Sequence, residues 1–88
     1  MSPAALDLLT KAYENYLDTY DRYFSYIFKN ADDLYFSIVG AQQLCEDGYI
    51  KNASDNIFSD RISIVPLDPI SFSITDKGID YMRSNRKS

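Results

Sequence analysis

Few side chains in this 88-residue chain have the chemistry that catalysis needs. There is no histidine, which is the commonest general base near neutral pH and the commonest metal ligand in proteins. The single cysteine, Cys45, therefore has no imidazole to activate its thiol. It falls on the apolar side of an expected helix, where we expect it to act as a small buried hydrophobe.

Two pairs of neighbouring carboxylates are the remaining candidates. Adjacent residues on a helix point about 100° apart, so neither Asp32 and Asp33 nor Glu46 and Asp47 converge on one substrate. The first pair suits the N-terminal turn of a helix, where the dipole favours negative charge, and the second suits a solvated helix end. The three glycines are too scattered to form a phosphate loop, and no calcium loop is present. We predict a protein that is not an enzyme and has no catalytic residue, cofactor, metal or small-molecule substrate.

Composition predicts one small domain spanning residues 1–88. Hydrophobic residues make up 45% of the chain, including eight Tyr and five Phe, and the net charge is −4. A lone cysteine excludes an internal disulfide and favours a reducing compartment. The N-terminus lacks the features of a signal peptide, and no stretch approaches the roughly 20 apolar residues of a membrane span. We therefore expect a cytoplasmic protein without membrane contact.

The N-terminal part, residues 1–29, has a helical pattern. Ser2 can cap a helix that begins with Pro3. The apolar residues between positions 5 and 28 then fall in one arc of roughly 160° at helical spacing. This predicts one long amphipathic helix of roughly 36 Å. The alternative is a break near residues 18–21 that divides it into two helices.

A second helix is predicted over residues 30–48. Asn30 is its expected N-cap, and Asp32 and Asp33 lie in its first turn. Phe36 and Val39 widen its apolar arc. Gly40 suits a close approach by another backbone, and Gly48 suits the left-handed end of the helix.

In the following segment, residues 49–74, the spacing of apolar residues changes from helical to every second residue. Apolar and polar residues alternate over positions 62–65 and again over positions 70–74. Pro66 and Pro69 lie between these runs and fit a turn. The pattern predicts a β-hairpin with one apolar face.

A short closing helix is predicted over residues 75–85. Thr75 is its expected N-cap, and Asp76 follows in its first turn. Residues 86–88 would form a frayed tail. The fold class is therefore α+β: a long amphipathic helix, a second helix, a hairpin wing and a short C-terminal helix.

Two segments resemble a known family. Residues 43–50, QLCEDGYI, resemble the exit from the third helix of winged-helix domains. Residues 74–82, ITDKGIDYM, resemble the segment that follows their wing. Together they are similar to the YjcQ-type winged-helix family, which comprises small, largely uncharacterised proteins of Gram-positive bacteria and phages. The resemblance covers residues 34–85 and implies a wing and a closing helix. Residues 1–29 depart from the family pattern, because winged helices usually place two shorter helices before the third.

The resemblance raises a DNA-binding hypothesis, because winged helices commonly dock their third helix in the major groove. That helix, residues 33–47, contains no Lys or Arg. Gln42 or Gln43 has the chemistry to read an adenine edge, and the wing offers only Lys51 and Arg61 as cations. Affinity for phosphates comes from cations, which this helix lacks, so nucleic acid is disfavoured as a partner. A DNA-binding regulator is kept as the alternative hypothesis.

The favoured hypothesis is a protein-interaction module of winged-helix type. Five tyrosines repeat at helical spacing in the first helix: Tyr13, Tyr16, Tyr20, Tyr23 and Tyr26. Tyrosine is typical of interfaces, so this stripe predicts self-association as a homodimer or contact with another protein. The alternative is that all five line the core. Tyr20→Ala would then destabilise the protein or dissociate it, by a few kcal/mol if the ring is buried. An acidic, phage-type inhibitor that mimics nucleic acid is a further alternative.

Overall fold

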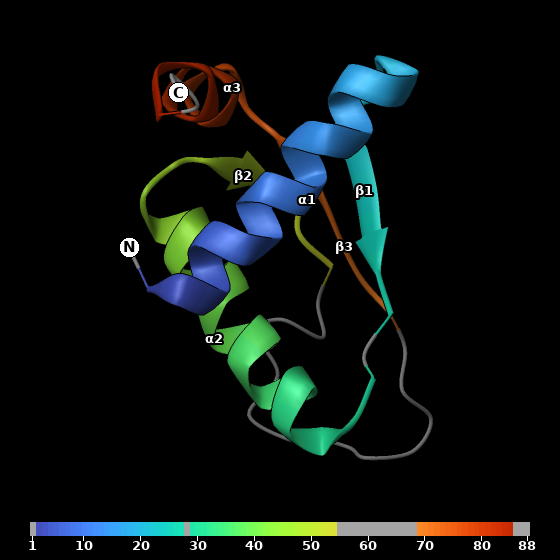
Figure 1. Cartoon of the computed structure of the whole chain (residues 1–88). Helices are drawn as coiled ribbons and strands as arrows, with labels where there is room; N and C mark the ends of the chain where they lie inside the picture. Colours follow the sequence, from blue (N-terminus) through green and yellow to red (C-terminus); the bar gives the residue numbers. More distant parts are fainter. Residues whose placement is uncertain (1, 28, 55–68, 86–88) are drawn as a thin grey trace.

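A computed structural model describes residues 2–27, 29–54 and 69–85. These residues form three helices and a three-stranded antiparallel sheet (Figure 1). The elements are α1 (Pro3–Thr19), β1 (Tyr23–Tyr26), α2 (Ala31–Glu46), β2 (Ile50–Lys51), β3 (Ile70–Ile74) and α3 (Asp76–Asn85). The predicted α+β class is confirmed, and the arrangement is compatible with a winged-helix-like fold. In the described part of the chain, two helices rather than three precede β2.

The first helix begins as predicted and ends earlier. The Ser2 side chain accepts a hydrogen bond from the Ala5 N–H, and Pro3 occupies the first turn. Tyr20 then adopts a left-handed conformation, with φ of 59°, and its N–H bonds to the Tyr16 carbonyl. The prediction of one helix through residue 29 is therefore wrong.

A strand, not a second helix, follows this break. The Asp21 carboxylate accepts a hydrogen bond from the Tyr23 N–H two residues on, which forms a turn directly before β1. Along β1 the side chains alternate between exposed and half-buried, as in a strand with one covered face. The Phe24 ring packs on Phe72 with 5.7 Å between ring centroids. The alternative of two helices is thus also wrong.

The sheet has the order β1-β3-β2, so the strand nearest the C-terminus lies in its centre. Phe24 pairs with Phe72 across β1 and β3, and Ile50 pairs with Ile74 across β2 and β3. Ile70, Phe72 and Ile74 are fully buried and alternate with half-buried serines, as predicted. The predicted partner strand at residues 62–65 lies outside the described residues.

The helices pack on each other at a glycine. A Cβ atom on Gly40 would lie 2.9 Å from the backbone nitrogen of Ala5, so only glycine allows α1 and α2 to approach this closely. The predicted close approach at Gly40 is confirmed. Helix α1 also contacts α3, β1 and β3, and it crosses the front of the molecule in the view of Figure 1. The buried core draws on α1, α2, β2, β3 and α3, and Phe24 and Tyr26 of β1 pack against it. It contains Ala5, Leu8, Leu9, Ala12, Tyr13, Leu34, Ile38, Ala41, Leu44, Ile50, Ile70, Phe72, Ile74, Ile79 and Met82.

Polar contacts join the start of α3 to the end of α2. The Thr75 hydroxyl accepts a hydrogen bond from the Gly78 N–H, as expected of a helix cap, and donates one to the Gly48 carbonyl at 2.7 Å. Gly48 has the predicted left-handed conformation, with φ of 78°. The Lys77 ammonium donates to the Asp47 carbonyl at 2.6 Å. The side chains of Thr75 and Lys77 thus satisfy carbonyl groups at the end of α2.

Candidate functional site

The five tyrosines of the predicted stripe do not share one surface. Tyr13 is buried in the core, and Tyr16 is half-buried with the Arg22 guanidinium 5.9 Å from its ring. Tyr20 is 83% exposed at the end of α1, and Tyr23 is exposed on β1. Since the helix ends at Thr19, no single helical seam carries all five rings.

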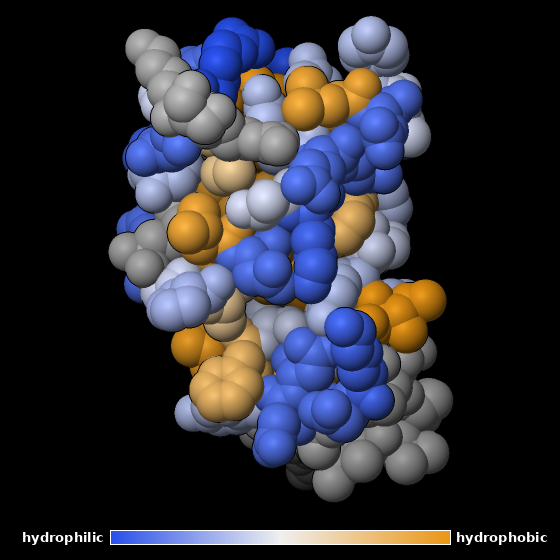
Figure 2. All heavy atoms as spheres, in the orientation of Figure 1, coloured by the Kyte–Doolittle hydropathy of each residue, from blue (hydrophilic) through white to orange (hydrophobic). Residues whose placement is uncertain are grey.

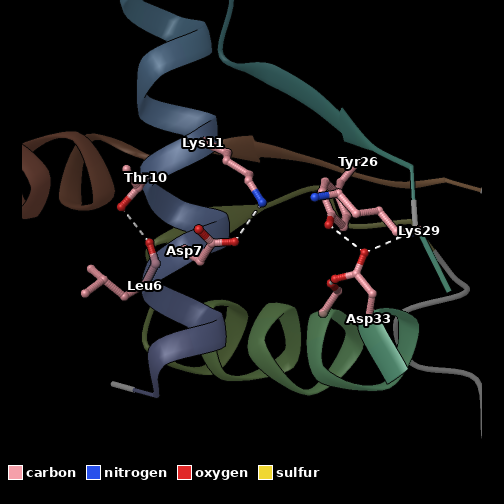
Figure 3. A network of polar contacts seen from close by, with 8 residues as sticks. Leu6, Asp7, Thr10, Lys11, Tyr26, Lys29 and Asp33 are labelled. Atoms are coloured by element: carbon pink, nitrogen blue, oxygen red, sulfur yellow. Dashed lines mark hydrogen bonds and ion pairs between the residues drawn. The ribbon is translucent and has the colours of Figure 1, made fainter. Parts of the chain in front are cut away.

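The fifth, Tyr26, belongs to an internal polar network (Figure 3). Its hydroxyl donates a hydrogen bond to Asp33 Oδ2 at 2.7 Å, and the Lys29 N–H donates to the same oxygen at 3.0 Å. The Lys11 ammonium lies 4.8 Å from the centre of the Tyr26 ring and is paired with Asp7 at 2.7 Å. The network connects α1, β1 and α2, which indicates a structural role.

The proton affinities in this network follow its contacts. Burial alone would raise the pKa of Asp33, but hydrogen bonds from Tyr26, the Lys29 N–H and Ser37 outweigh it and lower that pKa. Burial, followed by the hydrogen bond to Asp33, raises the pKa of Tyr26. The hydrogen bond to Asp7 raises the pKa of Lys11 against an opposing desolvation effect. Each group is therefore held in its ordinary charge state at neutral pH, unlike a general acid or base.

Three of the four residues predicted to contact nucleic acid lie in the described part of the chain. The Gln43 side-chain oxygen accepts a hydrogen bond from the Ser2 N–H at 2.9 Å, so it is engaged within the fold. Gln42 is half-buried, and Lys51 is exposed on β2. Arg61 lies outside the described residues. Helix α2 itself contains no Lys or Arg.

The outer face of α2 exposes three large apolar side chains. Tyr35 is 53% exposed, Phe36 58% and Val39 44%. The Tyr35 and Phe36 rings lie edge to face, with centroids 5.5 Å apart. Phe36 and Val39 lie opposite Leu34 and Ala41, which face the core, and Tyr35 lies beside them. Figure 2 shows apolar spheres reaching the surface over this helix. Phe36 and Val39, which widen the predicted apolar arc, lie at the surface.

Carboxylates bound this outer face along the helix. Asp32 precedes the apolar residues and Glu46 follows them, and both are exposed. We define the α2 outer face as Asp32, Tyr35, Phe36, Val39 and Glu46. Sequence reasoning missed this face as a site, although at about 100° per residue Phe36 and Val39 fall on the side of the helix opposite Leu34 and Ala41, which was the available signal.

Other candidate chemistry is sparse in the described part of the chain. Burial raises the pKa of the Cys45 thiol, which suits an unreactive side chain. Within residues 2–27, 29–54 and 69–85, no group of three or more Cys, Asp or Glu side chains is placed to hold a metal ion. None of the helices in those ranges combines the length and apolar character needed to cross a bilayer.

Comparison with protein-family models, with curated proteins and with solved structures finds no match for this chain. The resemblance of residues 34–85 to YjcQ-type winged-helix proteins therefore stays a prediction.

Proposed function

We propose that this chain is a non-enzymatic protein-interaction module and that the α2 outer face is its contact surface. The observation that carries the proposal is the exposure of Tyr35, Phe36 and Val39 together on one helix face. Single exposed hydrophobes are ordinary, but a contiguous apolar group bounded by polar residues is typical of interaction sites.

The residue types on this face support the same function. Tyr and Phe are enriched at protein interfaces, because they provide a large contact area at low side-chain entropy cost. Tyr35, Phe36 and Val39 lie at positions i, i+1 and i+4, so they present one continuous surface to a groove or to another helix.

Nucleic acid is a poor candidate for this face. DNA affinity requires cations that displace counterions from phosphates, and α2 supplies none. Two cations on other elements are engaged within the fold: Arg22 pairs with Asp76 at 2.7 Å, and Lys77 bonds to the Asp47 carbonyl. The charge distribution therefore favours a protein partner over DNA.

Site-specific photocrosslinking in the native host tests the proposal. A benzophenone amino acid replaces Phe36 in one variant and Tyr20 in a matched control, because both are exposed aromatic positions on different surfaces. We expect a discrete protein adduct from position 36 that is lost when Val39→Ser is added, and no such adduct from position 20. Circular dichroism checks that each variant is folded. Equal adducts from both positions, or none from position 36, would contradict the proposal.

Self-association remains a separate prediction. The tyrosine-rich segment has two exposed rings, Tyr20 and Tyr23, rather than the predicted helical stripe of five. Light scattering at tens of micromolar protein measures it directly, because a homodimer would have twice the mass of the chain.

A further inference from the structure

We infer that the partner of the α2 outer face is a protein segment with an apolar centre and Lys or Arg at both ends. This inference rests on the proposed function, since it concerns the same face. It specifies the chemistry of the partner from the arrangement of charge around the apolar residues.

The α2 outer face has carboxylates at matched positions. Asp32, Val39 and Glu46 are each seven residues apart, or about two helical turns, so they lie along one stripe of α2. The two carboxylates are about 21 Å apart along the axis at about 1.5 Å per residue. A segment lying along this stripe therefore meets negative charge, then apolar surface, then negative charge.

This symmetry disfavours a second copy of the chain as the occupant. In an antiparallel pair of α2 helices centred on Val39, each Asp32 would lie opposite Glu46 of the other copy. In a parallel pair, each carboxylate would lie opposite its own equivalent. Because the α2 outer face carries no cation, both of these arrangements bring like charges together, and no register pairs a carboxylate with a cation of the same face.

The carboxylates of Asp32 and Glu46 also disfavour negatively charged partners. Nucleic acid, an anionic membrane surface and an acidic peptide would each place negative charge beside Asp32 or Glu46. Cationic side chains at both ends of an apolar segment would instead pair with these carboxylates at the rim. The apolar centre would cover Tyr35, Phe36 and Val39, and an Arg side chain could also stack on either ring.

Selection from a displayed library of random 16-residue peptides tests the inference on the full-length chain. Peptides that bind the wild type are selected at low salt. Their affinities for the wild type and for the Phe36→Ser, Val39→Ser double variant are then compared. We expect binders that lose affinity for this variant, with Lys or Arg enriched toward both ends and apolar residues between them.

A charge comparison on one selected peptide completes the test. Replacing both rim carboxylates, Asp32→Asn with Glu46→Gln, should weaken its binding about fivefold or more. The matched control is Glu14→Gln with Asp18→Asn, which removes the same charge from exposed positions on α1 and should leave binding unchanged. Raised salt should reduce wild-type binding.

The outcomes separate the two proposals. Peptides that require Phe36 and Val39 but lack basic residues, or that ignore the loss of Asp32 and Glu46, would overturn this inference and leave the proposed function standing. If no selected peptide depends on Phe36 or Val39, the proposed function fails with it. A wild-type dimer that Phe36→Ser converts to a monomer would place a second copy on the face and overturn the inference.

Discussion

Asp33 joins three separate parts of the fold through one carboxylate. Its backbone N–H bonds to the Asn30 side chain at 2.8 Å, which caps α2. Its side chain accepts hydrogen bonds from Tyr26, the Lys29 N–H and Ser37. The sequence predicted Asp33 in the first turn of a helix. It could not predict the bond to Tyr26, because that contact depends on β1, which pairs with a strand more than forty residues away in sequence.

The lowered pKa of Asp33 predicts a pH dependence of stability. A carboxyl group whose pKa is lower in the folded than in the unfolded state stabilises the fold fully above its unfolded value, about 3.9. That stability is lost as pH falls below this value toward the folded pKa. Urea unfolding of the wild type and Asp33→Asn should therefore differ most near neutral pH and least near pH 3.

Tyr26→Phe provides a control for this interpretation. It removes one donor to the Asp33 carboxylate. The pH-dependent effect of Asp33→Asn on the free energy of unfolding should therefore be smaller in a Tyr26→Phe background, without disappearing. Tyr20→Phe, at a ring that is 83% exposed, should behave like the wild type. A difference between the wild type and Asp33→Asn that stays constant from pH 7 to pH 3 would contradict the assignment.

At the scale of elements, the end of α1 predicts a stabilising substitution. Tyr20 has φ of 59°, a left-handed conformation that costs a residue with a Cβ about 1–2 kcal/mol. Its ring is almost fully exposed, so little packing is lost on removal. Tyr20→Gly should therefore raise the free energy of unfolding by about 1 kcal/mol, measured by chemical denaturation.

This expectation opposes the one drawn from the sequence, in which Tyr20→Ala removes a packed ring. A change to glycine at Tyr13, which is buried, supplies the contrast. Tyr13→Gly should lower the free energy of unfolding by several kcal/mol. Destabilisation by Tyr20→Gly would show that the helix does not end where the structure places it.

The helix crossing predicts a destabilising substitution. Alanine usually stabilises a helix by about 1 kcal/mol relative to glycine. At Gly40, however, the added methyl group would press on the backbone of Ala5 and force α1 and α2 apart. Gly40→Ala should therefore lower the free energy of unfolding by about 1–3 kcal/mol. Ser84→Ala, on the exposed face of α3, is a control for propensity alone, and equal effects at both positions would refute the crossing.

The sequence predicted most helix boundaries, because short-range signals set them. Ser2, Asn30, Gly48 and Thr75 each cap or end a helix as expected. The segment after Thr19 was mispredicted as helix because its aromatic residues continue the helical spacing, although Tyr and Phe are also favoured in strands. Pairing of β1 with β3 favours a strand over a helix here, and this long-range pairing cannot be predicted from local sequence patterns.

At the scale of the whole molecule, the predicted site was only partly accessible to sequence reasoning. The lack of cations on the second helix was evident from the sequence and still disfavours DNA. The exposure of Phe36 and Val39 was not, because an apolar arc does not reveal how much of it the rest of the fold covers. In the structure, α1 packs against one side of α2, and the opposite side of α2 is exposed.

The charge distribution predicts weak interaction with nucleic acid. The chain has a net charge of −4, and its second helix has acidic ends without a cation. We expect no measurable binding to random duplex DNA at about 50 mM salt in a fluorescence anisotropy titration. Binding that appears at this salt concentration and weakens steeply as salt rises would favour the DNA-binding hypothesis instead.

The double role of Thr75 has a consequence for how the molecule opens. Its hydroxyl serves the first turn of α3 and the carbonyl of Gly48 at once, while its own N–H bonds to the Tyr49 carbonyl. Unravelling of α3 from its start would therefore also release the turn that leads from α2 into β2. The last helix and the middle of the chain should lose protection as one cooperative unit, although about 30 residues separate them in sequence.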